Sequence, residues 1–219
     1  MSSIAFYSCN FGNYRNELST INNINFEDDV DYYFFTDTSG SYITNLPSKW
    51  KIIVMDTRET RGTGDNIMND SRWASKYIKF ILPDVLKSYK TIIWADCKLL
   101  NNNFHINIKS LQDYSLVNIL HSRRKTPQEE LNKTIKLNLE NKINGKLFLK
   151  EIKYIKHQVP LIDTCFIIRK NDTTTNLLFE KVYSLLKTKG LKRDQNVYNH
   201  AIHILNYPIS NINLKNGLI

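Results

Sequence analysis

A short apolar segment that ends on an aspartate constrains the fold of this chain more than any other feature. Residues 91–95 (Thr-Ile-Ile-Trp-Ala) are β-prone, and the run has the length of a buried central strand. Asp96 follows directly. Ligands of open α/β sheets bind at the carboxyl ends of strands, where a divalent cation or a cationic partner offsets the desolvation of a carboxylate. Asp96 is therefore the first residue to connect with chemistry, the alternative being a turn cap.

Two further predicted strands also finish at aspartates. Residues 32–37 end on Asp37, and residues 50–55 are followed by Asp56. Residues 4–8 form another predicted strand, the first in the chain. The pattern places polar side chains along one edge of a parallel sheet.

Helical patterns alternate with these strands. Further strands are expected at 115–120 and 165–169, and helices at 66–82, 126–141, 146–157, 172–187 and 193–205. Gly145 is expected to break the helical pattern around it, and Gly190 to end the helix before it. Without an internal repeat or a linker, the alternation predicts a single domain over residues 1–219. Its expected fold class is an α/β/α sandwich around a mostly parallel sheet.

The chain is basic. Its 219 residues carry a formal net charge of +9, with a sequence pI near 9.3. This balance fits an anionic partner, which could be a nucleic acid, a nucleotide diphosphate or an acidic membrane surface, and it also fits a solvated lysine-rich surface. Charge alone does not choose among these.

Cysteine usage indicates a reducing, cytoplasmic location, which would be the host cytoplasm if the chain is viral. Cys9, Cys97 and Cys165 are far apart, which argues against a structural zinc site and a disulfide framework. The first residues lack the pattern of a signal peptide, and no segment approaches the roughly 20 apolar residues that span a bilayer. We therefore expect no membrane insertion.

Several enzyme classes lack their motifs here. The sequence at 61–65 (Arg-Gly-Thr-Gly-Asp) has two glycines, but the spacing of a phosphate loop and its Gly-Lys-Ser/Thr are missing. No His-Glu-x-x-His, Gly-x-Ser-x-Gly or Cys-x-x-Cys motif occurs. P-loop nucleotidases, dinucleotide-binding dehydrogenases, metalloproteases, serine hydrolases and dithiol redox enzymes are not supported.

The remaining polar residues suit a nucleotide diphosphate. Such a ligand needs aromatic rings for the base, cations for the phosphates, and a carboxylate-held Mn²⁺ or Mg²⁺ to bridge diphosphate oxygens. Arg72, Lys76 and Lys79 fall at i, i+4 and i+7 of one predicted helix face. The same parts would serve a metal-dependent nucleotidyltransferase, and a nucleic-acid-binding module without catalysis remains a further alternative.

Two residues are candidates for acid–base or substrate contacts. Asp163 lies in an apolar stretch at 160–166, where partial burial would raise the pKa of its carboxyl and suit a general base. A hydrogen-bonded structural role is the alternative. His121 follows an apolar strand and precedes Arg123 and Arg124, so it is a candidate for substrate contact or a plain loop residue.

Three stretches together resemble a glycosyltransferase family of the GT-A type. These stretches are 7–15 (Tyr-Ser-Cys-Asn-Phe-Gly-Asn-Tyr-Arg) with 34–37 (Phe-Phe-Thr-Asp), 72–83 with 93–96, and 193–195 (Arg-Asp-Gln). They are similar to the plant and bacterial glycosyltransferase-like family long catalogued as a domain of unknown function. They are also similar to the N-terminal glycosyltransferase domain of a chlorovirus capsid-glycan enzyme. The three stretches occur in the same order as in these families, and together they span almost the whole chain.

The resemblance implies a GT-A-like, Rossmann-like fold. It also implies that the chain transfers a sugar from a nucleotide diphosphate donor to a hydroxyl of a glycan or glycoprotein. A UDP-sugar is the expected donor. It implies Mn²⁺ or Mg²⁺ at Asp96, and no nucleic acid as partner. Its implied contacts to the donor and the reacting groups are as follows: Tyr7, Phe11 and Asp37 at the base and ribose, Arg72 and Lys76 near the donor, and Asp194 and Gln195 in the site.

Each of these residues has a structural alternative. Tyr7 and Phe11 could pack in the core, Asp37 could end a strand, and Asp194 could cap the last helix. Many GT-A enzymes carry Asp-x-Asp, whereas Lys98 stands at the third position here. Asp163 or Asp194 would act as the base if the reaction inverts the anomeric centre, and a retaining enzyme would need no such base.

Overall fold

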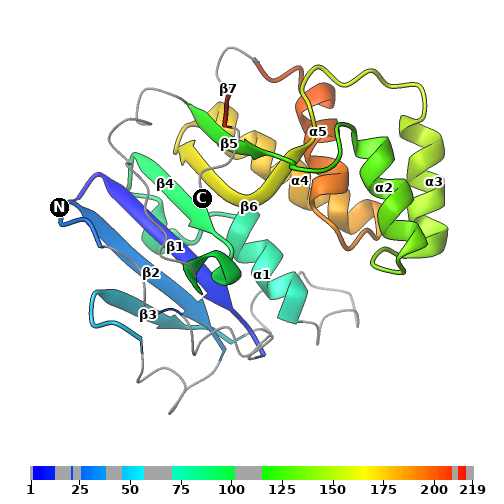
Figure 1. The fold of residues 1–219 in the computed structure, drawn as a ribbon. Helices are drawn as coiled ribbons and strands as arrows, with labels where there is room; N and C mark the ends of the chain where they lie inside the picture. Colours follow the sequence, from blue (N-terminus) through cyan, green and yellow to red (C-terminus); the bar gives the residue numbers. More distant parts are fainter. Residues whose placement is uncertain are drawn as a thin grey trace. The chain divides into compact units, whose positions relative to one another are not determined.

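The computed structural model describes residues 2–12, 21, 26–37, 46–56, 71–101, 115–208 and 212–215, and the chain divides into two compact units (Figure 1). The first unit holds residues 1–113 and 165–171 with residue 219, and the second holds residues 114–164 and 172–218. The single domain expected over residues 1–219 stays a prediction.

The first unit is built on a mostly parallel sheet. Its strands are β1 (Ile4–Asn10), β2 (Val30–Thr36), β3 (Trp50–Val54), β4 (Thr91–Ala95) and the later part of β6 (Ile162–Lys170). Their order is β3-β2-β1-β4-β6; the first four are mutually parallel and β6 runs antiparallel to β4. All seven residues of β1 and all five of β4 are buried, as expected for central strands. The predicted α/β class and mostly parallel sheet are confirmed.

Helix α1 (Ser71–Phe80) belongs to the same unit. The segment at 66–70, where the helix was predicted to begin, lies outside the described residues. Arg72 is exposed, Lys76 is half-buried and Lys79 is buried, although their spacing puts them on one face. Burial rises along this face because the last turn of α1 lies against β1, where Tyr7 Oη donates to the Lys79 carbonyl at 3.0 Å. Two short 3-10 helices, η2 (Asp84–Leu86) and η3 (Cys97–Asn101), flank β4 and were not predicted.

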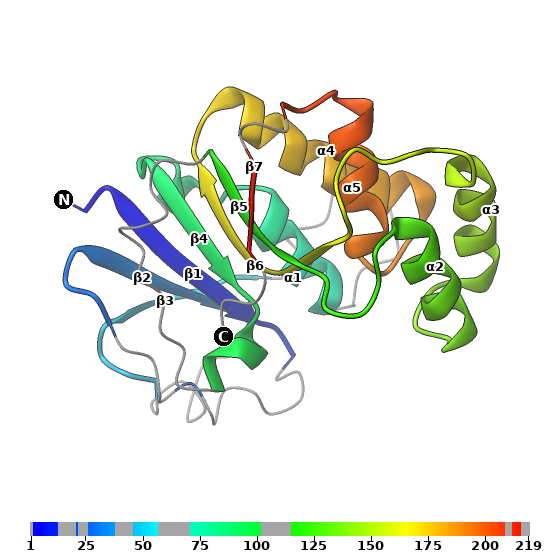
Figure 2. The same cartoon turned by 45° about the horizontal axis from the view of Figure 1, so that its top comes forward.

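The second unit is mostly helical (Figure 2). It contains α2 (Pro127–Lys136), α3 (Lys142–Ile152), α4 (Thr173–Lys189), α5 (Gln195–Ile204), the parallel strands β5 (Leu116–Leu120) and β7 (Ile212–Lys215), and residues 162–164 of β6. Helix α2 packs on α3 and α5, and α4 packs on α5. The four predicted helices of this unit are confirmed, with shifts of up to five residues at their ends, whereas β7 was not predicted.

Local signals explain several helix ends. Thr126 Oγ1 accepts a hydrogen bond from Glu129 N at 3.2 Å, and Pro127 takes the first position of α2. Asp172 Oδ1 accepts from Thr175 N at 2.8 Å and caps α4. Gly190 ends α4 in the left-handed region, at φ +58°. The predicted starts of helices near residues 126 and 172 and the predicted stop at Gly190 are confirmed.

The prediction that Gly145 breaks a helix is wrong. Gly145 lies inside α3 and is buried. A Cβ at this position would come within 2.9 Å of Ile135 Cγ1, so the absence of a side chain lets α3 approach α2 closely. The glycine marks helix–helix contact, and the local preference against helix is overridden by this packing.

Candidate active site

The carboxyl ends of four parallel strands define one edge of the first unit. Strand β1 has β2 on one side and β4 on the other, so the strand order reverses at β1. Such a reversal is the usual place for ligands in open α/β sheets, in the crevice outside the carboxyl ends. The predicted row of aspartates is confirmed here, since Asp37, Asp56 and Asp96 follow β2, β3 and β4.

Asp96 stands beside this reversal and is surrounded by cations. Its backbone N donates to the Cys165 carbonyl at 2.7 Å, which extends the β4–β6 ladder by one residue. Asp96 Oδ1 accepts from Trp94 Nε1 at 3.0 Å and lies 3.4 Å from Lys79 Nζ. Asp96 Oδ2 lies 3.7 Å from Lys98 Nζ. Both carboxylate oxygens therefore face ammonium groups.

Lys79 is the unexpected member of this cluster. Its side chain is only 6% exposed, and its ammonium group lies 5.5 Å from the Trp94 ring centroid and 5.4 Å from that of Phe80. A buried ammonium needs a carboxylate and aromatic faces to offset its lost hydration, and Asp96 with these two rings supplies both. Lys98 is exposed and pairs with Asp96 from the solvent side.

The described residues around Asp96 are a poor set of ligands for a resident metal ion. A divalent ion needs several oxygen ligands, and two ammonium groups next to Asp96 repel it. Within the ranges that the structure describes, no group of three or more His, Cys, Asp or Glu side chains is placed to hold a metal ion. Among the described residues, Asp96 thus stands with two cations and without a second carboxylate that could share a metal ion.

Asp37 joins two of the strand ends. Its Oδ1 accepts from the backbone N of Gly12 at 2.9 Å, so the loop after β1 is tied to the end of β2. Gly12 has φ +65°, and a Cβ there would lie 3.2 Å from Ser71 Cβ at the start of α1. The carboxylate is half-buried and sits at the edge where the resemblance places the donor's base and ribose.

Tyr7 and Phe11 lie in the core. Both are at most 1% exposed. The Tyr7 ring packs edge-on against Trp94 and Phe35, with centroids 5.1 and 6.2 Å away. Burial raises the pKa of the Tyr7 hydroxyl, against an opposing effect of the Arg169 guanidinium. Packing accounts for both rings as placed, and neither offers an open face on which a base could stack.

In the second unit, Asp163 is joined to the start of α5. Gln195 Nε2 donates to Asp163 Oδ1 at 3.0 Å, and Arg193 Nη2 donates to Gln195 Oε1 at 3.1 Å. Gln195 is buried and Asp163 is half-buried. Two of the predicted site residues, Asp163 and Gln195, are thus brought into direct contact, across 32 positions of the chain.

Asp194 precedes Gln195 at the N-cap position of α5. Its backbone carbonyl accepts from Val197 N and Tyr198 N, both at 3.0 Å, but its side chain makes no capping hydrogen bond. The carboxylate of Asp194 therefore does not cap α5, which was the structural alternative to a role in the site. Asp194 is half-buried.

A buried glutamate organises the segment before α5. Glu140 accepts from the backbone N of Lys192 at 2.7 Å, from that of Arg193 at 3.0 Å, and from Asn196 Nδ2 at 3.0 Å. The sequence did not reveal this residue because three of its partners lie more than 50 positions away and follow no periodic pattern. Glu140 positions the chain from which Asp194 and Gln195 project.

His121 belongs to a second network in this unit. Its Nδ1 accepts from the backbone N of Arg123 and of Arg124, both at 3.1 Å, and its Nε2 lies 3.0 Å from Arg124 Nη2. Arg124 Nε donates to the fully buried Glu130. Burial, followed by the charge of Arg124, lowers the pKa of His121, while the Glu130 and Asp163 carboxylates oppose this. His121 is therefore neutral at pH 7 and half-buried.

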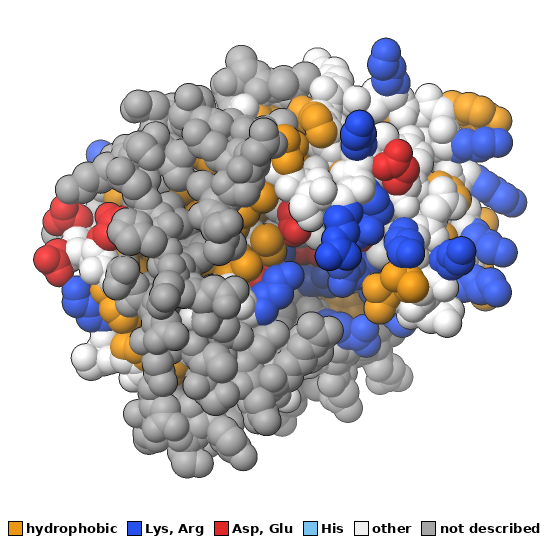
Figure 3. Space-filling view, in the orientation of Figure 1, with side chains coloured by type: hydrophobic (Ala, Val, Ile, Leu, Met, Phe, Trp, Pro, Cys, Tyr) orange, Lys and Arg blue, Asp and Glu red, His pale blue; other side chains and the backbone are white. Residues whose placement is uncertain are grey.

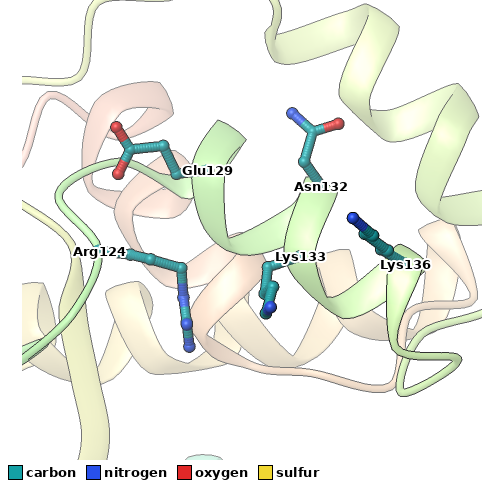
Figure 4. Close-up of a pocket in the computed structure, with 5 residues that line it drawn as sticks. All are labelled: Arg124, Glu129, Asn132, Lys133 and Lys136. Atoms are coloured by element: carbon teal, nitrogen blue, oxygen red, sulfur yellow. The ribbon is translucent and has the colours of Figure 1, made fainter.

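A shallow basic hollow lies on α2 next to this network. It has a volume of about 470 Å³, and its lining residues are Arg124, Glu129, Asn132, Lys133 and Lys136 (Figure 4). In the close-up, Arg124 and Lys133 extend to the same side of α2, and Glu129 points away from them. The hollow therefore presents positive charge.

Solved structures with a similar fold are sugar transferases. The galactosyltransferase LgtC, crystallised with donor and acceptor sugar analogues, matches with TM-score 0.54 and 9% identity over 97% of this chain and 73% of its own. Mouse xyloside xylosyltransferase 1 in its apo form matches with TM-score 0.51 and 12% identity over 97% of this chain and 84% of its own. The sequence matches no protein-family model and no curated protein.

At these identities the similarity shows the fold, which is GT-A-like, as the resemblance in the sequence implied. The narrower resemblance to the plant and bacterial family and to the chlorovirus domain stays a prediction. No helix within the described ranges is long and apolar enough to cross a membrane.

Proposed function

We propose that this chain is a glycosyltransferase that moves a sugar from a UDP-sugar to a hydroxyl of a glycan or glycoprotein. The observation that carries the proposal is the cluster of Asp96, Lys79 and Lys98 at the strand-order reversal of a GT-A-like sheet. Two solved sugar transferases share this fold. A fold alone does not define a function, whereas the charged side chains of this cluster suit a diphosphate ligand.

In the proposed reaction, an acceptor oxygen bonds to the anomeric carbon of the donor sugar. The bond between that carbon and the diphosphate oxygen breaks, and the nucleoside diphosphate leaves with the electron pair. Lys79 and Lys98 supply positive charge where the leaving diphosphate gains negative charge, and such preorganised charge lowers the barrier. Arg72 and Lys76 on α1 add to the positive charge of the first unit.

Asp163 is the proposed general base of an inverting reaction. It would take the proton of the acceptor hydroxyl as the new bond forms. The hydrogen bond from Gln195 fixes the orientation of the carboxylate, and Arg193 in turn orients the Gln195 amide. Asp194 is the rival base, and a retaining reaction would use neither. The anomeric configuration of the product decides between inverting and retaining transfer.

The proposed Mn²⁺ or Mg²⁺ dependence is a separate question. Asp96 is the carboxylate at which the resemblance implies the ion, but its oxygens face Lys79 and Lys98. An ion at Asp96 would have to displace at least one ammonium group and take most of its ligands from the diphosphate and water. Nucleotide binding must therefore be measured both with and without the ion.

A thermal-shift experiment tests the proposal. Wild-type protein and Asp96→Asn are heated with nucleoside diphosphates and UDP-sugars, with Mn²⁺ or with a chelator. A ligand at 100 times its dissociation constant stabilises the fold by about 2.7 kcal/mol, which is readily measured. We expect UDP to stabilise the wild type, and the part of this shift that depends on Mn²⁺ to be lost in Asp96→Asn and kept in the control Asp84→Asn, whose exposed carboxylate pairs with Lys87.

Product analysis then separates the rival functions. A glycosyltransferase releases UDP from a UDP-sugar, whereas a nucleotidyltransferase releases pyrophosphate. The absence of any shift with nucleotides, together with salt-sensitive binding of oligonucleotides, would reject the proposal and favour a nucleic-acid-binding module.

A further inference from the structure

The outer face of α3 is apolar where a surface helix is normally polar. Ile143 is 72% exposed and Leu147 is 60% exposed, and Tyr154 just beyond the helix is 86% exposed. The spacing of four residues puts Ile143 and Leu147 on one line of the helix, and Tyr154 follows the end of the helix. The buried side chains of α3, Phe148 and Ile152, lie on the opposite face and already attach the helix to its unit. The outer line is therefore not part of the core of the unit.

The loop that joins α2 to α3 adds two more exposed leucines. Leu137 is 51% exposed and Leu139 is 48% exposed. Together with Ile143, Leu147 and Tyr154 they form what we call the α2–α3 apolar stripe. Five of the nine large apolar side chains that are exposed among the described residues thus fall between residues 137 and 154. Concentrations of exposed apolar side chains mark interaction sites.

Lysines surround this stripe. Seven exposed lysines occur between residues 133 and 156: Lys133, Lys136, Lys142, Lys146, Lys150, Lys153 and Lys156. On α3, Lys142, Lys146 and Lys150 follow a row next to Ile143 and Leu147. Figure 3 shows lysine and arginine side chains along this part of the second unit, with hydrophobic side chains between them.

The acidic residues of the same segment do not neutralise these lysines. Only Glu140 and Glu151 occur between residues 133 and 156. Glu140 is buried and bound by N–H donors of the segment before α5. Glu151 pairs with Lys189 of α4 at 2.6 Å. The surface around the apolar stripe thus keeps a strong positive charge.

We propose that the α2–α3 apolar stripe and its lysines dock this chain onto an anionic phospholipid bilayer. Aliphatic and aromatic side chains enter the boundary between headgroups and acyl chains, and lysines at their flank attract acidic headgroups. The basic hollow of Arg124, Lys133 and Lys136 on α2 extends the same charge. This peripheral attachment goes beyond the proposed sugar transfer and does not depend on it.

Two other partners explain the surface less well. Phosphate groups of a nucleic acid would engage the lysines, but they leave Ile143 and Leu147 in water. A second copy of the chain would cover the stripe, but a symmetric contact would bring the same lysines face to face. An acidic bilayer satisfies both the apolar and the charged component.

Vesicle co-sedimentation of the full chain tests the proposal. We expect the chain to be retained by phosphatidylcholine vesicles that contain phosphatidylserine, to be retained only weakly by phosphatidylcholine alone, and to bind less as salt is added.

Ile143→Ser with Leu147→Ser should lower partitioning into the acidic vesicles about tenfold or more without changing the charge. Lys142→Gln with Lys146→Gln and Lys150→Gln should lower it by a similar factor. Leu177→Ser on α4, at a residue 51% exposed, is the matched control and should bind like the wild type.

Thermal melts show whether the variants fold, and Tyr154→Ser, beyond the end of α3, provides a second apolar variant that leaves the helix intact. Equal retention by neutral and acidic vesicles, or none by either, would overturn the proposal. So would oligonucleotide binding that depends on the three lysines but not on Ile143 and Leu147. Self-association that the serine variants abolish, without vesicle binding, would assign the stripe to a second copy instead.

Discussion

Lys79 Nζ and Asp96 Oδ1 lie 3.4 Å apart, and they join the last turn of α1 to the residue that follows β4. The lysine is enclosed, with 6% of its side chain exposed, whereas the aspartate is 31% exposed. The pair therefore holds a cation inside the first unit and leaves a carboxylate accessible at its edge. The same contact contributes to stability and shapes the electrostatics of the proposed donor site.

Loss of the Asp96 charge should destabilise the fold as well as remove any ion-dependent part of nucleotide binding. In Asp96→Asn, Lys79 keeps its enclosed position but loses its counter-charge, and we expect the free energy of unfolding to fall by about 1–2 kcal/mol. Urea unfolding at pH 7 measures the change. The control Asp84→Asn removes a carboxylate from an exposed pair with Lys87, so its effect should be clearly smaller. Equal effects of the two variants would mean that the Lys79–Asp96 contact is not formed in solution.

Replacement of Lys98 should make it easier for a divalent ion to reach Asp96. Lys98 Nζ lies 3.7 Å from Asp96 Oδ2 and competes with a metal for that oxygen. If Mn²⁺ binds with the diphosphate, Lys98→Ala should lower the Mn²⁺ concentration that gives half of the UDP-dependent thermal shift. Lys90→Ala, at an exposed residue before β4, is the control. An unchanged or raised midpoint would indicate that Lys98 itself supplies the charge and that no ion shares Asp96 with it.

The fold could be predicted largely from the sequence because its signals are local. Strands of short apolar runs and helices with Thr126, Asp172 and Gly190 at their ends were expected, and the structure has them. Gly145 shows the limit of such reasoning, since its role depends on Ile135 of the neighbouring helix. Strand β7 was missed because it pairs with β5, almost a hundred residues earlier, and its four residues carry little signal of their own.

The candidate site could be predicted only in part. Asp96 was found because a carboxylate after a buried strand is visible in the sequence. The enclosure of Lys79 was not, since helical spacing alone grouped it with the more exposed Arg72 and Lys76. Tyr7 likewise sits in a motif of the resemblance yet packs in the core. How deeply a side chain is buried depends on tertiary packing, which the spacing of residues along the sequence does not reveal.

The roles of Asp163 and Asp194 can be separated by kinetics. If Asp163 is the base of an inverting transfer, Asp163→Asn should lower kcat by about 100-fold to 10,000-fold and leave the KM for the donor nearly unchanged. Asp194→Asn should have a much smaller effect. Gln195→Ala removes the hydrogen bond that orients Asp163, so we expect an intermediate loss of kcat. The reverse ranking of the two aspartate variants would assign the base to Asp194.

A histidine cluster in the second unit should make stability depend on pH. The rings of His157, His200 and His203 lie with centroids 5.8–6.3 Å apart. Neither ring nitrogen of His157 has a hydrogen-bond partner among the residues that the structure describes. Burial, followed by the charges of His200 and His203, lowers the pKa of His157 from 6.5 to about 4. Burial also lowers the pKa of His200.

Between pH 6.5 and 4 the unfolded chain therefore binds more protons than the folded one, so the free energy of unfolding should rise with pH in this window. His157 is only half-buried, and after allowance for solvent screening we expect about 1–2 kcal/mol of stability to be lost on going from pH 7 to pH 4 through this residue. Urea unfolding across this range measures it. His157→Gln removes the titrating group and should flatten the profile, whereas the neighbouring exposed Lys156→Gln should leave its slope unchanged. A slope that survives in His157→Gln would place the responsible groups elsewhere, with His200 the next residue to replace.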